Sequence, residues 1–255
     1  MQKVPVSVVV ITKNEATRIR ECLESVSWAQ EIIVLDDFST DNTVAIAKEY
    51  TPHVSQRLME NEGKHRNYAY SLSSCEWVLS LDADERVTPE LRDEITALLS
   101  GAPDCNGYAI PRRNFLGKVW VKNGGMYPSA QLRLFKREMF KYDELAEVHP
   151  QAYMKDPRGN LKSDIIHYTY RDFTDAIAKM DRQTDLEARK WFRENRKIGV
   201  FSSLRKTVDR FWRAYFNKKG YKDGVIGLFL AVNSGMYQFL SFAKTWEMKK
   251  AAKNK

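Results

Sequence analysis

The stretch Trp77-Val78-Leu79-Ser80-Leu81-Asp82-Ala83-Asp84-Glu85 joins an apolar run to an acidic cluster, and it decides the fold. A second stretch has the same form, with Ile32-Ile33-Val34-Leu35 followed by Asp36 and Asp37. Apolar runs of this length rich in β-branched residues are typical of buried strands. Carboxylates at the carboxyl ends of strands in an α/β sheet lie where such folds bind ligands. The two stretches therefore predict a ligand site at one edge of a sheet.

Strand and helix patterns alternate through the first 100 residues. We expect strands over residues 6–11, 31–35, 54–57 and 77–81, and helices over residues 15–27, 40–50, 64–74 and 89–100. Ser39 or Thr40 is the expected N-cap of the second helix. This alternation predicts an α/β fold, with a mostly parallel, Rossmann-like sheet covered by flanking helices.

The pattern changes after Gly101. Short strand patterns follow, interrupted by glycines, over residues 107–111, 119–122, 131–135 and 164–168. Helical patterns dominate from residue 172 to the end. We therefore expect an α/β domain over residues 1–170, with its acceptor-binding half over residues 101–170, and a helical extension over residues 171–255.

The net charge of +8 is concentrated in the last part of the chain. Residues 201–255 hold 12 Lys/Arg and 3 Asp/Glu, a balance of +9, so residues 1–200 balance at −1. A basic segment of this kind indicates an acidic partner, either anionic lipid or nucleic acid.

Two helical patterns in the extension favour anionic lipid over nucleic acid as this partner. Residues 203–217 place apolar and aromatic side chains at helical spacing, with arginine and lysine between them, as in a basic amphipathic helix. Residues 224–243 contain no charged side chain over 20 positions, but they include three glycines and several polar residues. We favour docking in the membrane interface over packing in a core, and both over spanning the bilayer.

Composition limits the class of protein and its compartment. A hydrophobic content of 43% supports a folded core and argues against global disorder. The three cysteines, Cys22, Cys75 and Cys105, have no metal-binding or redox spacing, which favours reduced thiols in the cytoplasm. The N-terminal strand pattern leaves no room for a signal peptide, so none is expected.

The acidic clusters indicate a cation site. Asp82 and Asp84 are one residue apart at a strand end, where both can reach one Mg²⁺ or Mn²⁺, and a cation removes the repulsion between them. The alternative for Asp82 and Asp84 is that they merely precede and stabilise the start of the helix at Pro89. The alternative for Asp36 and Asp37 is that they merely cap the next helix. Clustering beyond what capping needs favours binding of a nucleotide diphosphate through the cation.

An ordered set of motifs resembles the family 2 (GT-A) glycosyltransferases. They are residues 6–14, Asp36-Asp37-x-Ser39-x-Asp41-x-Thr43, Asn61-Glu62-Gly63-Lys64-x-Arg66-Asn67 and Leu81-Asp82-Ala83-Asp84-Glu85. Further pieces are Pro111-Arg112-Arg113-Asn114, Gly124-Gly125-x-Tyr127-Pro128, Gln131-Leu132-Arg133-Leu134-Phe135 and Lys219-Gly220-Tyr221-Lys222-Asp223-Gly224. The set is similar to small bacterial β-1,4-glucosyltransferases of the lipopolysaccharide inner core.

The resemblance implies a nucleotide-sugar site in residues 1–100. Asp37 would accept from the uracil imide, and Asp36 would orient the base or the ribose. The remaining implied contacts to the nucleotide sugar are Thr12, Asn14, Glu15, Lys64, Arg66 and Asp82. For Lys64, a solvated helix face is the competing interpretation.

The resemblance also implies a metal centre and a catalytic base. Asp84 would be the direct metal ligand, with Asp82 near it and His167 as a further ligand. Related enzymes usually read Val-His-Glu where this chain has Val148-His149-Pro150, so the expected base is absent. We expect Glu147 to replace it, followed by Asp143 and His149 as candidates.

The implied reaction is the inverting transfer of a hexose, with glucose as the first candidate, from a UDP-sugar to a lipopolysaccharide-core or other lipid-linked glycan. Candidate acceptor-side residues are Trp120, Gly125, Tyr127 and Gln131, since aromatic faces pack against sugar rings. The expected location is the inner face of the cytoplasmic membrane, on an anionic surface, with no nucleic-acid partner.

Two other classes of protein remain as alternatives. A sugar nucleotidyltransferase would carry a glycine-rich phosphate loop after its first strand, but no glycine occurs before Gly63. A non-enzymatic basic scaffold would explain the charge of residues 201–255 but gives no purpose to the two acidic strand ends.

Overall fold

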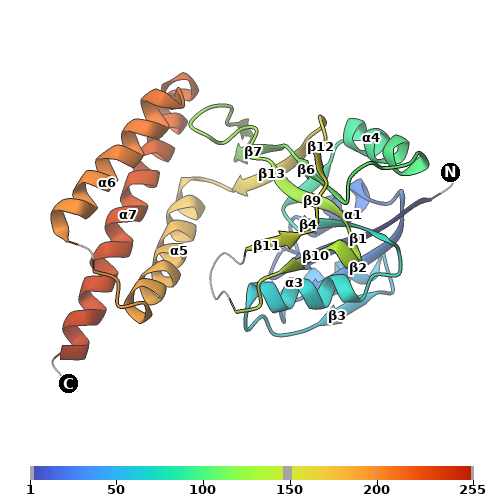
Figure 1. Ribbon diagram of the computed structural model, residues 1–255, viewed down its shortest axis with the longest axis horizontal. Helices are drawn as coiled ribbons and strands as arrows, with labels where there is room; N and C mark the ends of the chain where they lie inside the picture. The colour runs from blue at the N-terminus through green and yellow to red at the C-terminus, as the bar shows by residue number, and fades with distance from the viewer. Residues whose placement is uncertain (1–2, 146–150, 198, 254–255) are drawn as a thin grey trace. The chain divides into compact units, whose positions relative to one another are not determined.

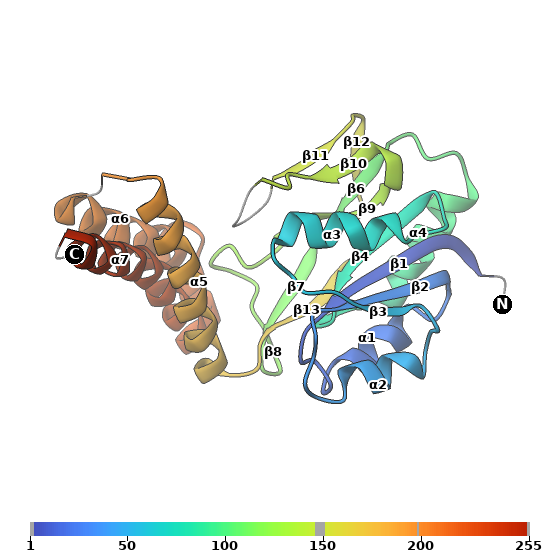
Figure 2. The same ribbon diagram turned by 90° about the horizontal axis from the view of Figure 1, so that it is seen from below.

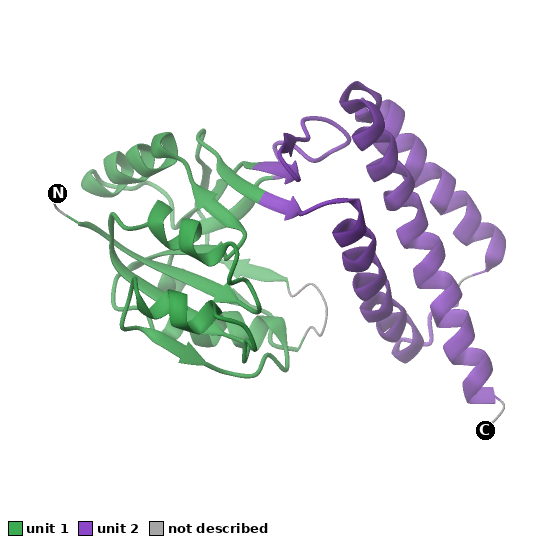
Figure 3. Cartoon of the chain, turned by 180° about the vertical axis from the view of Figure 1, so that it is seen from behind, with its two compact units in different colours: residues 1–112, 130–167 green, residues 113–129, 168–255 purple. Residues whose placement is uncertain are grey.

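A computed structural model describes residues 3–145, 151–197 and 199–253 (Figure 1). The chain divides into two compact units (Figure 3). Unit 1 comprises residues 1–112 and 130–167, and unit 2 comprises residues 113–129 and 168–255. The chain passes from one unit to the other after residues 112, 129 and 167, so each unit is assembled from two separate segments.

Unit 1 is built on a seven-stranded sheet with the order β12-β6-β9-β4-β1-β2-β3. In chain order its strands are β1 (Val4–Thr12), β2 (Ala29–Asp36), β3 (Val54–Gln56), β4 (Trp77–Asp82), β6 (Gly107–Ile110), β9 (Gln131–Lys136) and β12 (Arg158–Asn160). The pairs β1–β2, β1–β4, β2–β3 and β6–β12 are parallel, whereas β9 runs antiparallel to both β4 and β6. The α/β class with a mostly parallel sheet is confirmed.

Alternation along the central strands creates two apolar cores, one on each face of the sheet. Val6, Val8 and Val10 of β1 pack into one core, together with side chains of α1 (Ile19–Ser25), α2 (Thr43–Lys48) and α4 (Pro89–Ser100). Val9 packs into the other core with Ala69 and Tyr70 of α3 (Glu62–Ser71). Figure 2 shows α3 on the opposite side of the sheet from α1 and α2. Helices on both faces explain why the strands are apolar throughout instead of alternating with polar residues.

The strand order reverses next to β1. Strands β2 and β3 lie on one side of β1, and β4, which follows them in the chain, lies on the other. In open α/β sheets a crevice forms at such a point, outside the carboxyl ends of the strands. The register places Thr12 beside Asp36, and Ile11 beside Asp82, so both acidic clusters start at this edge.

Smaller strands complete unit 1. β5 (Glu85–Val87) pairs antiparallel with the first residues of β13 (Ile165–Tyr170), which sets His167 opposite Glu85. β10 (Phe140–Tyr142) follows a 3₁₀ turn (Arg137–Met139) and forms an antiparallel ribbon with β11 (Ala152–Met154).

Unit 2 contains a hairpin and three long helices. Strand β7 (Arg112–Leu116) begins at the last residue of unit 1's first segment and pairs antiparallel with β8 (Val119–Trp120). The helices are α5 (Phe173–Arg193), α6 (Val200–Trp212) and α7 (Gly224–Lys253). A π-helical turn (Arg213–Asn217) and a 3₁₀ turn (Gly220–Asp223) connect α6 to α7. The predicted C-terminal helical extension is present.

Helix α7 buries an unusual face. Its buried side is formed by small and polar residues, namely Gly227, Ala231, Gly235, Gln238, Ser241 and Thr245. Lys244 extends to Asp181 and Asp185 of α5 at 2.7 and 2.6 Å. The segment Gly220–Lys253 is long and apolar enough to cross a membrane by length and composition. Only 28% of its most apolar window is buried within the structure, so most of that window is exposed.

The structure corrects several details of the sequence-based expectations. Neither Ser39 nor Thr40 caps α2, because the helix starts later, at Thr43, after Asn42. Ser39 instead donates to Asp36. Strands β5, β7, β10, β11 and β12 were not predicted, since at three to five residues they carry little periodicity. β6 and β9, expected in the strand-rich half over residues 101–170, extend the main sheet.

Candidate active site

A cavity of about 240 Å³ lies at the carboxyl edge of the sheet, within unit 1. Its lining comes from the ends of β1, β2 and β4 and from the start of α3: Ile11, Thr12, Lys13, Glu15, Asp37, Met59, Glu62, Arg66, Asp82, Ala83 and Asp84. Three acids from two separate sequence clusters, Asp37, Asp82 and Asp84, therefore share one cavity. This is the arrangement that the two acidic stretches predict.

The adjacent acids Asp36 and Asp37 have different surroundings. Asp36 is fully buried and accepts hydrogen bonds from Ser39 and from Nε2 of Gln56, at 2.8 Å, so it fixes the turn after β2. Asp37 lines the cavity and accepts from Nζ of Lys13 at 2.7 Å and from the Met59 N–H at 2.9 Å. Burial alone would raise the pKa of Asp37, but these two donors outweigh it and hold the pKa below its usual value. Asp37 is thus ionised and faces the cavity.

Asp82 is engaged by two arginines. Its Oδ1 accepts from Nη2 of Arg66 at 2.9 Å, and its Oδ2 accepts from Nη2 of Arg133 at 2.6 Å. Burial opposes ionisation of Asp82, yet Arg133 and Arg66 lower its pKa well below the usual range. Arg133 also reaches the fully buried Glu85 at 2.7 Å. Asp82 therefore belongs to a network of charged side chains with Arg66, Arg133 and Glu85. Of these, Asp82 and Arg66 line the cavity.

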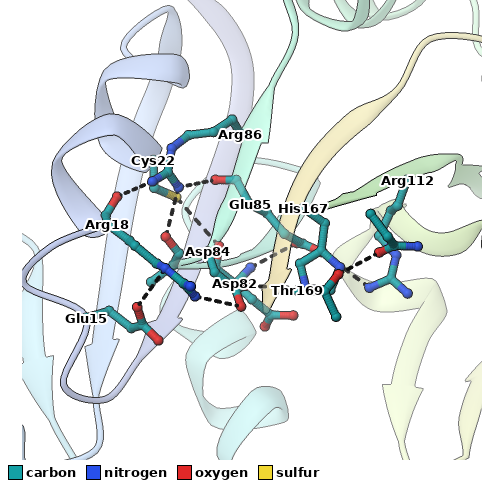
Figure 4. Close-up of polar contacts among 12 residues, drawn as sticks. Glu15, Arg18, Cys22, Asp82, Asp84, Glu85, Arg86, Arg112, His167 and Thr169 are labelled. Atoms are coloured by element: carbon teal, nitrogen blue, oxygen red, sulfur yellow. Dashed lines mark hydrogen bonds and ion pairs between the residues drawn. The ribbon is translucent and has the colours of Figure 1, made fainter. Parts of the chain in front are cut away.

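Asp84 points toward a different set of partners (Figure 4). Its Oδ1 lies 3.6 Å from Nε2 of His167, and its Oδ2 lies 3.6 Å from Nη1 of Arg18. Arg18 also approaches Glu15, with 3.9 Å between Nε and Oε2. The antiparallel pairing of β13 with β5 brings His167 here, 83 residues after Asp84 in the chain.

A carboxylate and an imidazole side by side fit a divalent cation as a partial ligand set. Asp84 and His167 supply these two groups, whereas both oxygens of Asp82 are occupied by arginine. Among the described residues, no group of three or more His, Cys, Asp or Glu side chains is placed to hold a metal. A cation here would therefore need further ligands from the bound substrate.

The other predicted donor-site residues separate into two groups. Thr12, Glu15 and Arg66 line the cavity, and the buried Thr12 hydroxyl has no hydrogen-bond partner among the described residues. An unpaired buried hydroxyl is costly unless a ligand satisfies it. Asn14 lies outside the lining, where its Oδ1 accepts from the Thr40 N–H at 2.8 Å. Lys64 is exposed on the first turn of α3 and does not line the cavity.

The predicted base falls in a segment that the structure does not describe. Glu147 and His149 both lie within residues 146–150, outside the described residues. Next to that segment, Oδ1 of Asp143 accepts from the Leu145 N–H at 2.9 Å, and Glu144 accepts from Nδ2 of Asn67 at 2.9 Å.

Three of the predicted acceptor residues lie together in unit 2. Trp120 and Tyr127 form an edge-to-face pair with ring centroids 5.4 Å apart, and Gly125 lies in the loop between them. Gln131 starts β9 and belongs to unit 1.

Arg18, Arg133 and Lys13 contact the acidic residues but were not among the predicted site residues. Arg133 had a visible signal, because it is a charged residue between the apolar residues Leu132 and Leu134 of a strand. A buried arginine needs a carboxylate partner, and the acidic cluster offers one. Arg18 and Lys13 follow β1 in a polar segment that gives no comparable signal.

Comparison with known proteins defines the class. The family model described as "Glycosyl transferase family 2" matches residues 7–155, more than half of the chain. The match includes the ends of β1, β2 and β4, with the cavity residues Asp37, Asp82 and Asp84. The protein is therefore an enzyme of the glycosyltransferase class, and the two alternative classes are set aside. The chain belongs to glycosyl transferase family 2.

Curated relatives match over almost the full length. A lipopolysaccharide core biosynthesis glycosyltransferase, LpsC of Rhizobium meliloti, is 25% identical over 96% of this chain and 93% of its own length. An uncharacterized glycosyltransferase of Rickettsia bellii is 40% identical over 95% of this chain and 86% of its own length. The predicted resemblance to lipopolysaccharide-core enzymes is confirmed.

Solved structures support the fold. A mannosyltransferase from Pyrobaculum calidifontis, solved with GDP-Man and Mn²⁺, has a TM-score of 0.54 at 13% identity and covers 96% of this chain and 88% of its own. Residues 1–349 of S. aureus TarS give a TM-score of 0.50 at 16% identity, over 96% of this chain and 88% of that one. At such low identity these matches concern the fold alone.

Proposed function

We propose that this protein transfers a hexose, with glucose as the first candidate, from a UDP-sugar to a lipopolysaccharide-core or related lipid-linked glycan. The observation that carries the proposal is the single cavity at the sheet edge that gathers Asp37, Asp82 and Asp84. Family 2 membership makes the reaction a glycosyl transfer. The name of the Rhizobium meliloti relative supports the choice of acceptor class.

The donor nucleotide would bind between the ends of β1 and β2. Asp37 is ionised and held in place by Lys13 and Met59, so it can accept from an imide N–H of uracil without first reorganising. The unpaired Thr12 hydroxyl lines the same cavity and would find its partner in the nucleoside. Asp36 would act indirectly, by holding the turn that presents Asp37.

The diphosphate would lie near Asp84, with a divalent cation. Asp84 and His167 would hold Mg²⁺ or Mn²⁺, which would supply charge neutralisation for the departing diphosphate. The Mn²⁺ in the structure of the mannosyltransferase neighbour supports this choice. Arg18 adds positive charge beside Asp84, and Arg66 does so beside Asp82. These guanidiniums would stabilise the negative charge that develops on UDP as the sugar leaves.

The transfer would invert the anomeric carbon in one displacement. The acceptor hydroxyl oxygen bonds to C1 of the sugar while the bond from C1 to the β-phosphate oxygen breaks, and the electron pair leaves with UDP. A base must take the hydroxyl proton. Glu147 remains our first candidate, followed by Asp143 and His149.

Membrane association of unit 2 forms the last part of the proposal. The polar residues Gln238 and Ser241, which argue against contact with lipid in the sequence, lie on the buried side of α7. Its outward side exposes Val225, Leu228, Val232 and Met236, and α6 exposes Phe201, Leu204, Val208 and Trp212. Exposed apolar rows on basic helices fit the interface of an anionic bilayer, so we propose a peripheral location on the cytoplasmic membrane.

The test is transfer by the full-length protein to glycan from a strain that lacks it. Lipopolysaccharide from the deletion strain should be one hexose lighter by mass spectrometry, and wild-type protein with UDP-glucose and Mn²⁺ should restore that mass. The Asp84→Ala variant should not restore it. An unchanged glycan mass in the deletion strain, or full activity of Asp84→Ala in EDTA, would refute the proposal.

A further inference from the structure

A second cavity, of about 420 Å³, lies entirely within unit 2. Lys122, Asn123, Gly125 and Tyr127 line it from the loop after β8, and Lys218 lines it from the turn between α6 and α7. Two motifs nearly 100 residues apart in the sequence, Gly124-Gly125-x-Tyr127-Pro128 and the segment that starts at Lys218, thus form one site. The donor and metal chemistry described above uses neither of them.

Specific contacts hold the two segments together. Asp223 accepts from the backbone N–H of Asn123 at 2.7 Å and from its Nδ2 at 2.9 Å, and the Gly124 N–H donates to the Lys218 carbonyl at 2.8 Å. Gly220 packs so closely on Ala214 that an added Cβ would lie 2.7 Å from the Ala214 carbonyl oxygen. These contacts fix the backbone on both sides of the cavity.

Gly125 lets the Lys218 side chain cross the loop. Its φ of +87° suits glycine, and a Cβ there would lie 2.8 Å from both Cδ and Nζ of Lys218. The Lys218 side chain therefore passes over Gly125 and reaches the cavity, where a larger residue at position 125 would contact it. Lys122 lies on the same wall, with Nζ 4.5 Å from the centre of the Trp120 ring.

The charge of this cavity is not balanced internally. Within the part of the chain that the structure describes, neither Lys122 nor Lys218 forms an ion pair with a carboxylate, and the donors of Asn123 already engage Asp223. Beneath Lys122, the indole N–H of Trp120 is buried and has no hydrogen-bond partner among the described residues. Two ammonium groups at the cavity, one of them over the Trp120 ring, are suited to an anionic group on a sugar.

We propose that this cavity binds a phosphate or carboxylate group of the lipid-linked glycan acceptor. This inference rests on the proposed function, and it adds that the acceptor must be an acidic glycan. Lys122 and Lys218 provide the charge-assisted hydrogen bonds, while Tyr127 and Pro128, which line the cavity, provide the apolar edge for the adjoining sugar ring. Recognition of the anion sets acceptor affinity and leaves donor binding unaffected.

The kinetic test replaces each lysine by methionine, which keeps the aliphatic chain and removes the charge. Lys122→Met and Lys218→Met should each raise the KM for core oligosaccharide from the deletion strain about tenfold, because a charge-assisted hydrogen bond is lost, with the KM for UDP-glucose unchanged. Lys118→Met and Lys222→Met are matched controls, since both lysines are exposed in unit 2 and neither lines the cavity. Unchanged acceptor KM in both cavity variants would overturn the proposal.

Changing the glycan identifies the source of the anion. Treatment of the oligosaccharide with phosphatase, or reduction of its carboxyl groups, should raise the wild-type KM but leave that of the double lysine variant unchanged. If the variants instead lose only binding to phosphatidylglycerol vesicles and keep their KM for the lipid-free oligosaccharide, the anion belongs to the bilayer and the assignment to the acceptor is wrong.

A binding measurement separates this inference from the proposed function. In full-length protein labelled with ¹⁵N, the Trp120 indole signal, assigned with Trp120→Phe, should shift in a saturable way as inorganic phosphate is added. The shift should disappear in the double lysine variant. Absence of any shift in wild-type protein would overturn the anion site, whether or not sugar transfer is observed. Conversely, a wild-type protein that shows the shift but transfers no sugar would refute only the proposed function.

Discussion

Arg133 donates a hydrogen bond of 2.6 Å from Nη2 to Oδ2 of Asp82, so that β9 neutralises the acid at the end of the neighbouring strand β4. The same nitrogen reaches Oε1 of the buried Glu85 at 2.7 Å. One guanidinium thus stabilises two carboxylates that would otherwise repel each other beside the donor cavity.

Loss of this guanidinium should destabilise unit 1. Arg133→Met leaves Glu85 and Asp82 without their closest cation, and removing one partner of a buried ion pair costs about 3–5 kcal/mol. Urea unfolding followed by circular dichroism measures this change. Arg158→Met, at an exposed ion pair on β12, is the control and should change stability by less than about 1 kcal/mol. Equal effects of the two substitutions would contradict the assigned role of Arg133.

Asp82 should make the protein sensitive to acid. Its pKa is lowered in the folded state, so its ionised form contributes stability above the unfolded pKa of about 3.9. That contribution is lost as the pH falls from about 4 toward the lower folded pKa. Urea midpoints of the wild type should therefore fall more steeply below about pH 4 than those of Asp82→Asn. Parallel pH profiles would show that Asp82 is not the group responsible.

Asp36 and Asp37 should respond differently to the same amide substitution. Asp37→Asn removes the charged acceptor that faces the cavity and should raise the Kd for UDP about tenfold by titration calorimetry. Asp36→Asn should mainly lower the melting temperature, because Ser39 and Gln56 depend on its oxygens. If Asp36→Asn weakened UDP binding more than Asp37→Asn without loss of stability, the assignment would have to be reversed.

The metal proposal predicts a shared effect of two substitutions. Asp84→Asn and His167→Gln should each weaken Mn²⁺ binding in the presence of UDP, by about 10–100-fold. Electron paramagnetic resonance of free Mn²⁺ gives the affinity directly, without reliance on turnover. Asp93→Asn, on the exposed side of α4, is the matched control. Mn²⁺ affinity unchanged in both site variants would exclude this pair as ligands.

Membrane docking should depend on the exposed row of α6. Val208→Glu and Trp212→Glu should each reduce sedimentation with phosphatidylglycerol vesicles about tenfold, since burial of such side chains contributes about 1.5–3 kcal/mol. Leu58→Glu places the same charge at an exposed apolar position of unit 1 and should leave vesicle binding unaffected. Equal binding of all three variants would argue that α6 does not enter the interface.

The acidic residues at the sheet edge could be predicted from the sequence because the signals for them lie in short, continuous stretches of the chain. The apolar runs before Asp36 and Asp82 define β2 and β4, and their ends meet at the carboxyl edge of the sheet as predicted. Asp37, Asp82 and Asp84 could be found in this way because each lies at the end of its strand or within two residues after it.

Other features depend on pairings that no local pattern reveals. Whether Asp36 or Asp37 faces the cavity is set by the turn that Ser39 and Gln56 hold. The two arginines on Asp82 are Arg66 of α3 and Arg133 of the antiparallel strand β9, which lies 51 residues after Asp82 in the chain. Long-range contacts of this kind decide that Asp82 is paired with arginine, although its spacing from Asp84 suggests a shared cation.

The opposite placement of Asp36 and Asp37 limits how this region can evolve. Successive residues of a strand point to opposite faces, so deleting one residue within β2 would turn the buried side chains before Asp36 to the other face or break the pairing of Asp36 with Thr12. Insertions and deletions should therefore be rare in homologues between Ala29 and Asp37, and more frequent in loops that no buried carboxylate anchors.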